Sequence, residues 1–179
     1  GAPPRGSRPD ETHDRGVTSW LACLAPFAFV ALPPLAYCLL LATTAVNVPY
    51  LDDYDTILRF LLETREAGRE PLKLLLAQPV EHRIGFLRAI ALGMASASGP
   101  VDFVTLAWIG FLGLALLALG LFAAWQPGTP LRVKLLGFAP VVLCLFQPQF
   151  WDAFFWATSS LSNLWVLPLA LATLAMLSR

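Results

Sequence analysis

The sequence predicts an all-α protein: a polytopic transmembrane chain of about four spans, with amphipathic interfacial helices in its first outer loop. Two observations predict this class. Hydrophobic residues make up 57% of the 179 positions and charged residues only 13%, whereas soluble globular domains carry about 45–50% and about 25%. The apolar residues also gather into long runs, and a helix needs roughly 20 of them to cross a bilayer. These runs are too long for barrel strands, and helices satisfy their own backbone groups within hydrocarbon.

The first 16 residues are rich in proline, glycine and charge and show no hydrophobic period. Such a segment cannot bury enough apolar surface to fold, so we expect a disordered cytoplasmic tail over 1–16 and a membrane domain over 17–179. The first span is expected at about 19–46, and its proline pair, Pro33 and Pro34, predicts a kink. The chain has no initial Met, and its last apolar run stops abruptly at the final residue, which favours a fragment of a longer protein.

A charged outer loop is expected over 47–100. It holds 13 of the 24 Asp, Glu, Lys and Arg residues of the chain, and a membrane protein that crowds its ionisable groups into one loop has usually placed its chemistry there. The loop should begin with an amphipathic helix over 56–67, because Ile57, Phe60 and Leu61 share one face at helical spacing.

Two further helical stretches are predicted in this loop. Pro71 occupies a tolerated first-turn position and predicts a short helix over 72–77. The stretch 81–98 also has a helical pattern but carries much charge for a span. We interpret it as interfacial or shallowly re-entrant; the alternative is a fifth crossing, which would invert everything downstream.

The remaining spans are expected at about 102–125, 133–150 and 159–178. The third apolar run is short, so this span must take residues from the segment Gln147–Trp151. Asp102 is expected to cap the second span.

Lysine and arginine indicate the orientation. Six basic residues precede the first span, join the second and third, or follow the fourth, and four spans place all six on one side. The outer loop also carries six, but these are spread over a longer segment that should fold on its own. We therefore place the N-terminus in the cytoplasm and the loop outside. The 12 basic and 12 acidic residues cancel, so no basic excess points to nucleic acid, and membrane lipids are the expected partners.

Three acidic residues, Asp52, Asp53 and Asp55, directly follow the first span. Carboxylates at a membrane edge can act as a general base for an acceptor hydroxyl or hold a divalent cation through oxygen ligands. An acidic cluster that only caps the next helix is an equally good interpretation, because Asp at this position favours the helix dipole.

Basic groups follow later in the same loop, in Glu81-His82-Arg83 and at Arg88. Arginine binds phosphate well through its planar fork of donors. Ordinary contact with lipid headgroups is an alternative of about equal weight.

A further carboxylate, Asp152, follows the third span, and four spans return it to the same outer face as Asp52. Ionisable groups near the membrane are functional candidates. The aromatic residues around Asp152 are interpreted as an interfacial belt rather than a platform that stacks on sugars.

This order of features resembles the GT-C superfamily of polytopic membrane glycosyltransferases: an acidic cluster after the first span, amphipathic helices, a His-basic pair and an Asp after the third span. It is especially similar to bacterial members with a Glu-His-Arg-Ile motif and a following aromatic-rich loop. The resemblance covers roughly 47–163. It implies an enzyme of the bacterial inner (plasma) membrane that transfers a sugar from a polyprenyl-phosphate donor to an acceptor at the outer face.

The resemblance also implies roles for single residues, and it leaves the use of a divalent metal open. The implied positions are, for catalysis, Asp52 or Asp53 together with Asp152 and, at the donor phosphate, His82, Arg83 and Arg88. Two departures stand out: Arg-Ile replaces the Pro-Pro pair that often follows the His, and the family module has more spans. The alternative from another class is a non-catalytic polytopic protein, either a transporter piece or an assembly subunit. A transporter should place polar groups near the bilayer midplane, and no Asp, Glu, Lys or Arg lies deep in a span.

Overall fold

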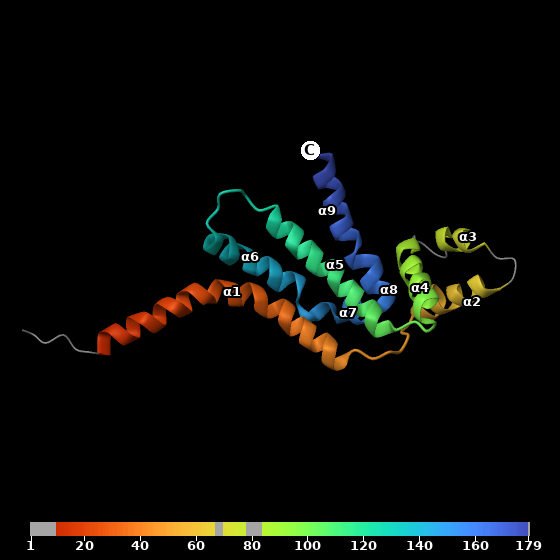
Figure 1. The fold of residues 1–179 in the computed structure, drawn as a ribbon, viewed down its shortest axis with the longest axis horizontal. Coiled ribbons are helices and arrows are strands. Elements are labelled where there is room, and N and C mark those ends of the chain that lie inside the picture. The colour runs from red at the N-terminus through yellow and green to blue at the C-terminus, as the bar shows by residue number, and fades with distance from the viewer. Residues whose placement is uncertain (1–9, 67–69, 78–83, 179) are drawn as a thin grey trace, which may run out of the picture.

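A computed structural model describes residues 10–66, 70–77 and 84–178, with side chains described from residue 24 onward. Every regular element in these ranges is helical (Figure 1). Four helical segments within them are long and apolar enough to cross a membrane. The predicted all-α polytopic class is therefore confirmed. The four segments are Leu24–Thr44, Phe103–Ala123, Leu131–Phe155 and Ala157–Leu177.

The first span belongs to α1 (Asp10–Thr44), a helix of 35 residues that contains three prolines. It is bent in its middle, where these prolines lie (Figure 1). Proline removes an intrahelical hydrogen bond and so accounts for the bend. The structure assigns residues 10–16 to α1, whereas a tail was expected over 1–16. Residues 1–9 lie outside the described ranges.

The other spans pack together through α5 (Phe103–Ala123), α6 (Leu131–Leu145) and α9 (Val166–Leu177). α1 packs along α6, and α5 packs against α9. The third span is not one continuous helix, since α6 ends at Leu145. Gln147-Pro148 follows, and Pro148 cannot continue the ladder. Short segments then lead to α9: η2 (Pro148–Phe150), α7 (Trp151–Phe155), α8 (Ala157–Ser159) and η3 (Ser160–Leu164).

The outer loop forms four short elements at one end of the spans (Figure 1). They are η1 (Tyr54–Arg59), α2 (Phe60–Arg65), α3 (Pro71–Leu76) and α4 (Gly85–Ser98). Pro71 begins α3 as predicted. The 14 residues of α4 span about 21 Å, which is less than the hydrocarbon thickness of about 30 Å. α4 is thus too short for a fifth crossing.

This end of the molecule has its own apolar core. The predicted apolar face of the first loop helix is buried, with Ile57, Phe60 and Leu61 packed on residues of α4, α5 and η3. A second cluster lies among the spans around Tyr37 and Phe138. The outer loop is therefore folded against the bundle.

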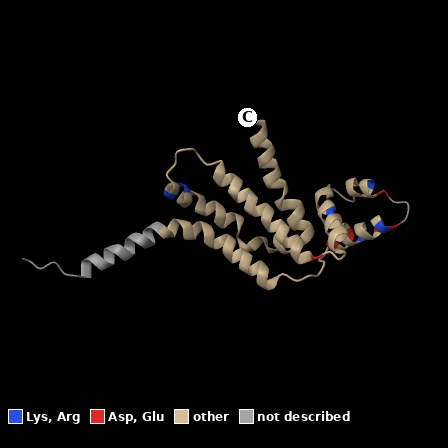
Figure 2. Cartoon of the chain, in the orientation of Figure 1, with Lys and Arg blue, Asp and Glu red and all other residues tan. Residues whose placement is uncertain are grey.

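Charged side chains gather at the two ends of the described structure (Figure 2). Arg132 and Lys134 lie at the start of α6, and the charges of the outer loop lie at the opposite end. This separation agrees with four spans and with an outer loop that faces away from the α5–α6 turn.

Two glycines of α5 allow close helix packing. A Cβ atom at Gly110 would lie 2.6 Å from the Cβ of Ser160, and one at Gly113 would lie 2.8 Å from the Trp165 ring. Both distances are too short for a side chain. Because the helix surface is bare there, the Trp165 indole reaches the Ile109 carbonyl and donates a 2.8 Å hydrogen bond.

Candidate active site

Asp53 is buried at the junction of the outer loop and the fourth span, with 1% of its surface exposed. Its carboxylate accepts three hydrogen bonds. The Tyr50 backbone N–H donates to Oδ2 at 3.0 Å, and Thr158 donates to Oδ1 from its N–H at 2.9 Å and from its hydroxyl at 2.6 Å. One carboxylate thus joins two segments that are 105 residues apart in the chain.

The Thr158 hydroxyl extends this contact to a third residue. It lies 2.7 Å from the hydroxyl of Thr56, and since each hydroxyl has one proton, the Thr56 proton is shared between the Thr158 oxygen and the Asp52 carbonyl. Thr56 belongs to η1. Thr158 belongs to α8 and lies two positions before Ser160, the first residue of η3. Both η1 and η3 are π-helical, a rare geometry that is frequent at functional sites.

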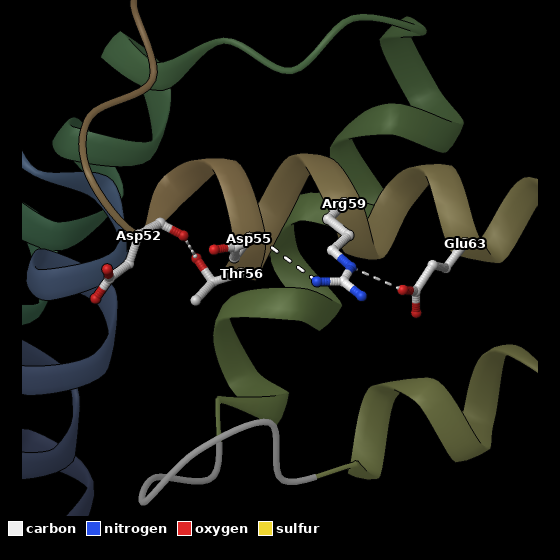
Figure 3. Close-up of polar contacts among 5 residues, drawn as sticks. All are labelled: Asp52, Asp55, Thr56, Arg59 and Glu63. Carbon is white, nitrogen blue, oxygen red and sulfur yellow. Dashed lines mark hydrogen bonds and ion pairs between the residues drawn. The ribbon is translucent and has the colours of Figure 1, made fainter.

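Asp52 differs from its neighbour in being exposed. Its backbone carbonyl accepts from the hydroxyl of Thr56 at 2.6 Å, while its carboxylate hydrogen-bonds to no described residue. Figure 3 shows this carboxylate directed away from the row formed by Asp55, Arg59 and Glu63. In that row Arg59 lies 3.8 Å from Asp55 and 3.1 Å from Glu63. Asp52 is thus the member of the acidic cluster whose carboxylate is exposed and has no hydrogen bond or ion pair with a described residue.

An apolar cavity of about 470 Å³ lies next to these residues. Its walls come from the end of α1, the segment 45–50, the start of α5 and the region around α7. Tyr50 and Trp156 both line it and meet edge to face with ring centroids 6.1 Å apart. The indole Nε1 of Trp156 is buried and has no hydrogen-bond partner in the described part of the chain, although buried donors are normally paired.

Asp152 lies in α7 at this same end, six positions before Thr158, and is exposed. Its neighbours divide: Trp151 is exposed and lines the cavity, whereas Phe154 is buried against Tyr37 with ring centroids 4.3 Å apart. The structure therefore brings Asp152 to the end that carries Asp52, as a four-span topology requires.

Arg88 is buried in α4, with 7% of its surface exposed. Its guanidinium donates from Nη1 to the carbonyls of Leu74 and Ala77 at 2.7 and 3.1 Å and lies over the Phe60 ring. Burial lowers the pKa of Arg88, and the nearby Glu63 carboxylate opposes that shift. In this arrangement Arg88 caps the end of α3, where the Leu74 carbonyl also accepts from the Ala77 N–H. The Arg88 Nε is buried without a partner among the described residues, and Arg88 is not one of the residues that line the cavity.

The two other basic positions predicted for the donor phosphate, His82 and Arg83, lie outside the described residues. The described neighbours that flank this segment are Ala77, which Arg88 holds, and Ile84, which is buried in the outer-loop core.

Sequence reasoning missed Thr56 and Thr158. Thr158 stands beside the polar run Ser159-Ser160 at the start of the last span, and that run was the only signal for it. Asp102, in contrast, caps α5 as predicted, accepting from the Val104 N–H at 3.1 Å.

In the described ranges no group of three or more His, Cys, Asp or Glu side chains is arranged to hold a metal ion. Magnesium that is bound through one or two carboxylates, water and substrate phosphates needs no such group. Comparisons with family models, curated proteins and solved structures gave no match for this chain.

Proposed function

We propose that this protein is a membrane glycosyltransferase that transfers a sugar from a polyprenyl-phosphate donor to an acceptor hydroxyl at the outer face of the bacterial plasma membrane. One observation carries the proposal. The exposed Asp52 carboxylate stands two residues from Tyr50, a wall residue of an apolar, aromatic-lined cavity at the end of the first span. A general base and a site for an apolar substrate are thus adjacent.

The cavity suits a lipid-linked donor because of where its walls lie. Leu40 and Thr44 belong to the first span, Tyr50 follows the end of that span, and Trp156 lies between the third and fourth spans. Tyr and Trp favour the membrane–water boundary, where one end of the ring is apolar and the other is wet. An isoprenoid chain would lie on the apolar walls and its phosphate would emerge near Asp52.

In the proposed reaction the acceptor hydroxyl oxygen attacks the anomeric carbon of the sugar while Asp52 takes the hydroxyl proton. The bond from that carbon to the phosphate oxygen breaks, and polyprenyl phosphate leaves. His82 and Arg83 would offset the charge on the leaving phosphate, since charge-assisted hydrogen bonds to phosphate are strong. We assign Arg88 no part in this step, because its side chain is buried away from the cavity walls and its Nη1 already donates to two carbonyls of the α3 segment.

The orientation that we propose follows from charge. Arg132 and Lys134 lie at the end opposite the outer loop, and basic residues favour the cytoplasmic side. The N-terminus would then be cytoplasmic and Asp52 outside.

The test uses the full chain in proteoliposomes with a panel of polyprenyl-phosphate sugars and measures the release of polyprenyl phosphate. Removing a general base typically lowers the rate by about 10²–10⁴-fold, so Asp52→Asn should abolish release. Asp55→Asn is the matched control, because Asp55 is an exposed carboxylate three positions away that pairs with Arg59. Equal loss in both variants, or full activity in Asp52→Asn, would refute the assignment, and no turnover of any donor by the unmodified chain would overturn the proposal.

A further inference from the structure

We propose that Asp53 is a positioning residue: by binding Tyr50 and Thr158 at once, it sets the width of the apolar cavity. Its consequence for sugar transfer rests on the function proposed above, but the geometric inference does not. Asp53 connects Tyr50, near the start of the outer loop, with Thr158, near the start of the last span. Tyr50 lines the cavity, and Thr158 lies two residues after the lining residue Trp156.

The connection runs through a single carboxylate. Oδ2 takes the Tyr50 N–H, and Tyr50 is itself a wall residue. Oδ1 takes the N–H and the hydroxyl of Thr158, which lies two residues beyond a second wall residue, Trp156. The Tyr50 and Trp156 rings meet edge to face, so the carboxylate and the ring contact hold the same two segments together.

Burial makes this tie effective. Asp53 is 1% exposed, so water does not compete for its oxygens, and hydrogen bonds of a charged group are stronger away from water. The same burial leaves its carboxylate no open side for a substrate. Asp52 and Asp53 therefore have different roles, although they are adjacent in the chain. Asp52 is exposed to solvent, and Asp53 connects two wall segments of the cavity.

The backbone on each side of the tie shows why a tie is needed. Leu51, between Tyr50 and Asp52, has φ of 44°, a left-handed conformation that a leucine adopts only where its surroundings enforce it. On the other side, Trp156 is extended between α7 and α8 and interrupts the helix. The two wall segments that carry Tyr50 and Trp156 thus each adjoin an irregular backbone residue. The Asp53 carboxylate hydrogen-bonds to both segments.

The experiment measures the distance across the cavity by pulsed electron paramagnetic resonance. Spin labels replace Val46 and Trp151, which line the cavity and are 69% and 53% exposed, in a chain whose three native cysteines are changed to serine. We expect Asp53→Asn and the isosteric Thr158→Val to broaden and lengthen the distribution. Losing hydrogen bonds to a charged group should shift the balance of tied and untied forms by roughly tenfold or more.

Two variants serve as controls. Thr158→Ser keeps the hydroxyl and should restore the unmodified distribution, and Asp52→Asn should leave it unchanged because the Asp52 carboxylate contacts no described residue. If Asp53→Asn does not fold, Thr158→Val still carries the test. If either Asp53→Asn or Thr158→Val folds and leaves the distance distribution unchanged, the inference is overturned.

Activity then separates the inference from the proposed function. Where sugar transfer is measurable, Asp53→Asn and Thr158→Val should raise KM for the lipid donor roughly tenfold with Thr158→Ser restoring it, while Asp52→Asn should lower kcat. A widened cavity without any transfer by the unmodified chain supports the tie and refutes the enzyme. Loss of transfer in Asp52→Asn with an unchanged distance in Asp53→Asn supports the enzyme and refutes the tie.

Discussion

Substitution of Gly110 by alanine gives the sharpest test of how α5 positions the candidate site. Gly110 faces Ser160, the first residue of η3, which follows Thr158 by two positions. Both positions are buried. An added Cβ would lie 2.6 Å from the Cβ and 2.6 Å from the Oγ of Ser160, whereas carbon atoms pack at about 3.5–4.0 Å. The two elements must therefore separate.

The expected cost follows from a comparison with a second glycine. Gly93 lies on the exposed side of α4 and has nothing within 4 Å of an added Cβ, so Gly93→Ala should show only the helix-propensity gain of about 1 kcal/mol. Gly110→Ala has the same gain but also overpacks a buried contact, at a cost of about 1–3 kcal/mol. The free energy of unfolding should thus differ between the two variants by about 1–3 kcal/mol, with Gly110→Ala the less stable.

The assay is equilibrium unfolding in mixed micelles with increasing sodium dodecyl sulfate, followed by far-ultraviolet circular dichroism. A double-mutant cycle with Ser160→Gly isolates the contact, because that change removes the two Ser160 side-chain atoms that the new Cβ would meet and leaves only the Ser160 backbone carbon, at 3.4 Å. The pair should show a coupling of about 1 kcal/mol or more, within the range for residues in contact. Gly110→Ala as stable as Gly93→Ala, or a coupling near zero, would refute this account of the α5–η3 packing.

The remaining two predictions concern the ends of helices. Asp102→Ala removes the cap of α5, including the contacts with the Val104 N–H and the Thr105 hydroxyl, and should lower the free energy of unfolding by about 1 kcal/mol in the same assay. Asp102→Ser should stay within a few tenths of a kcal/mol of the unmodified chain, and equal effects of the two changes would contradict the capping role. Arg88→Met removes the donor to the carbonyls of Leu74 and Ala77 and should speed amide hydrogen exchange across 70–77 while leaving α5 unchanged. Unaltered exchange over 70–77 would show that α3 does not depend on Arg88.

Local patterns in the sequence predicted most of the helical architecture. The apolar spans, the buried face of the first loop helix, Pro71 at the start of α3 and Asp102 at the start of α5 all depend on residues within one or two turns of each other. A break between the third and fourth spans was expected over 151–158, but its position at Trp156 was not predicted, because neither proline nor glycine marks it and the surrounding residues are apolar.

The division between Asp52 and Asp53 could not be predicted for a related reason. Asp52 and Asp53 are the same residue type at nearly the same distance from the first span. Their side chains nevertheless point in different directions, since successive side chains in a helical turn are about 100° apart. Only the packed fold decides which of them turns inward. Here the deciding partner, Thr158, is 105 residues away in the sequence.

The buried carboxylate also bears on the choice between an enzyme and a non-catalytic membrane protein. A charge removed from water is costly unless its hydrogen bonds are complete, and a buried polar contact is a weak source of stability but can enforce one geometry. A loop that only rests on lipid headgroups gains nothing from a fixed geometry, whereas a loop that presents Asp52 beside a cavity does. The catalytic role that we propose for Asp52 would give the buried contact of Asp53 a purpose, whereas a loop that only rests on headgroups needs no such contact. The two hypotheses differ in what they predict for Asp52→Asn. Both expect this change of an exposed side chain to leave the fold intact, and only the enzyme hypothesis expects it to abolish sugar transfer.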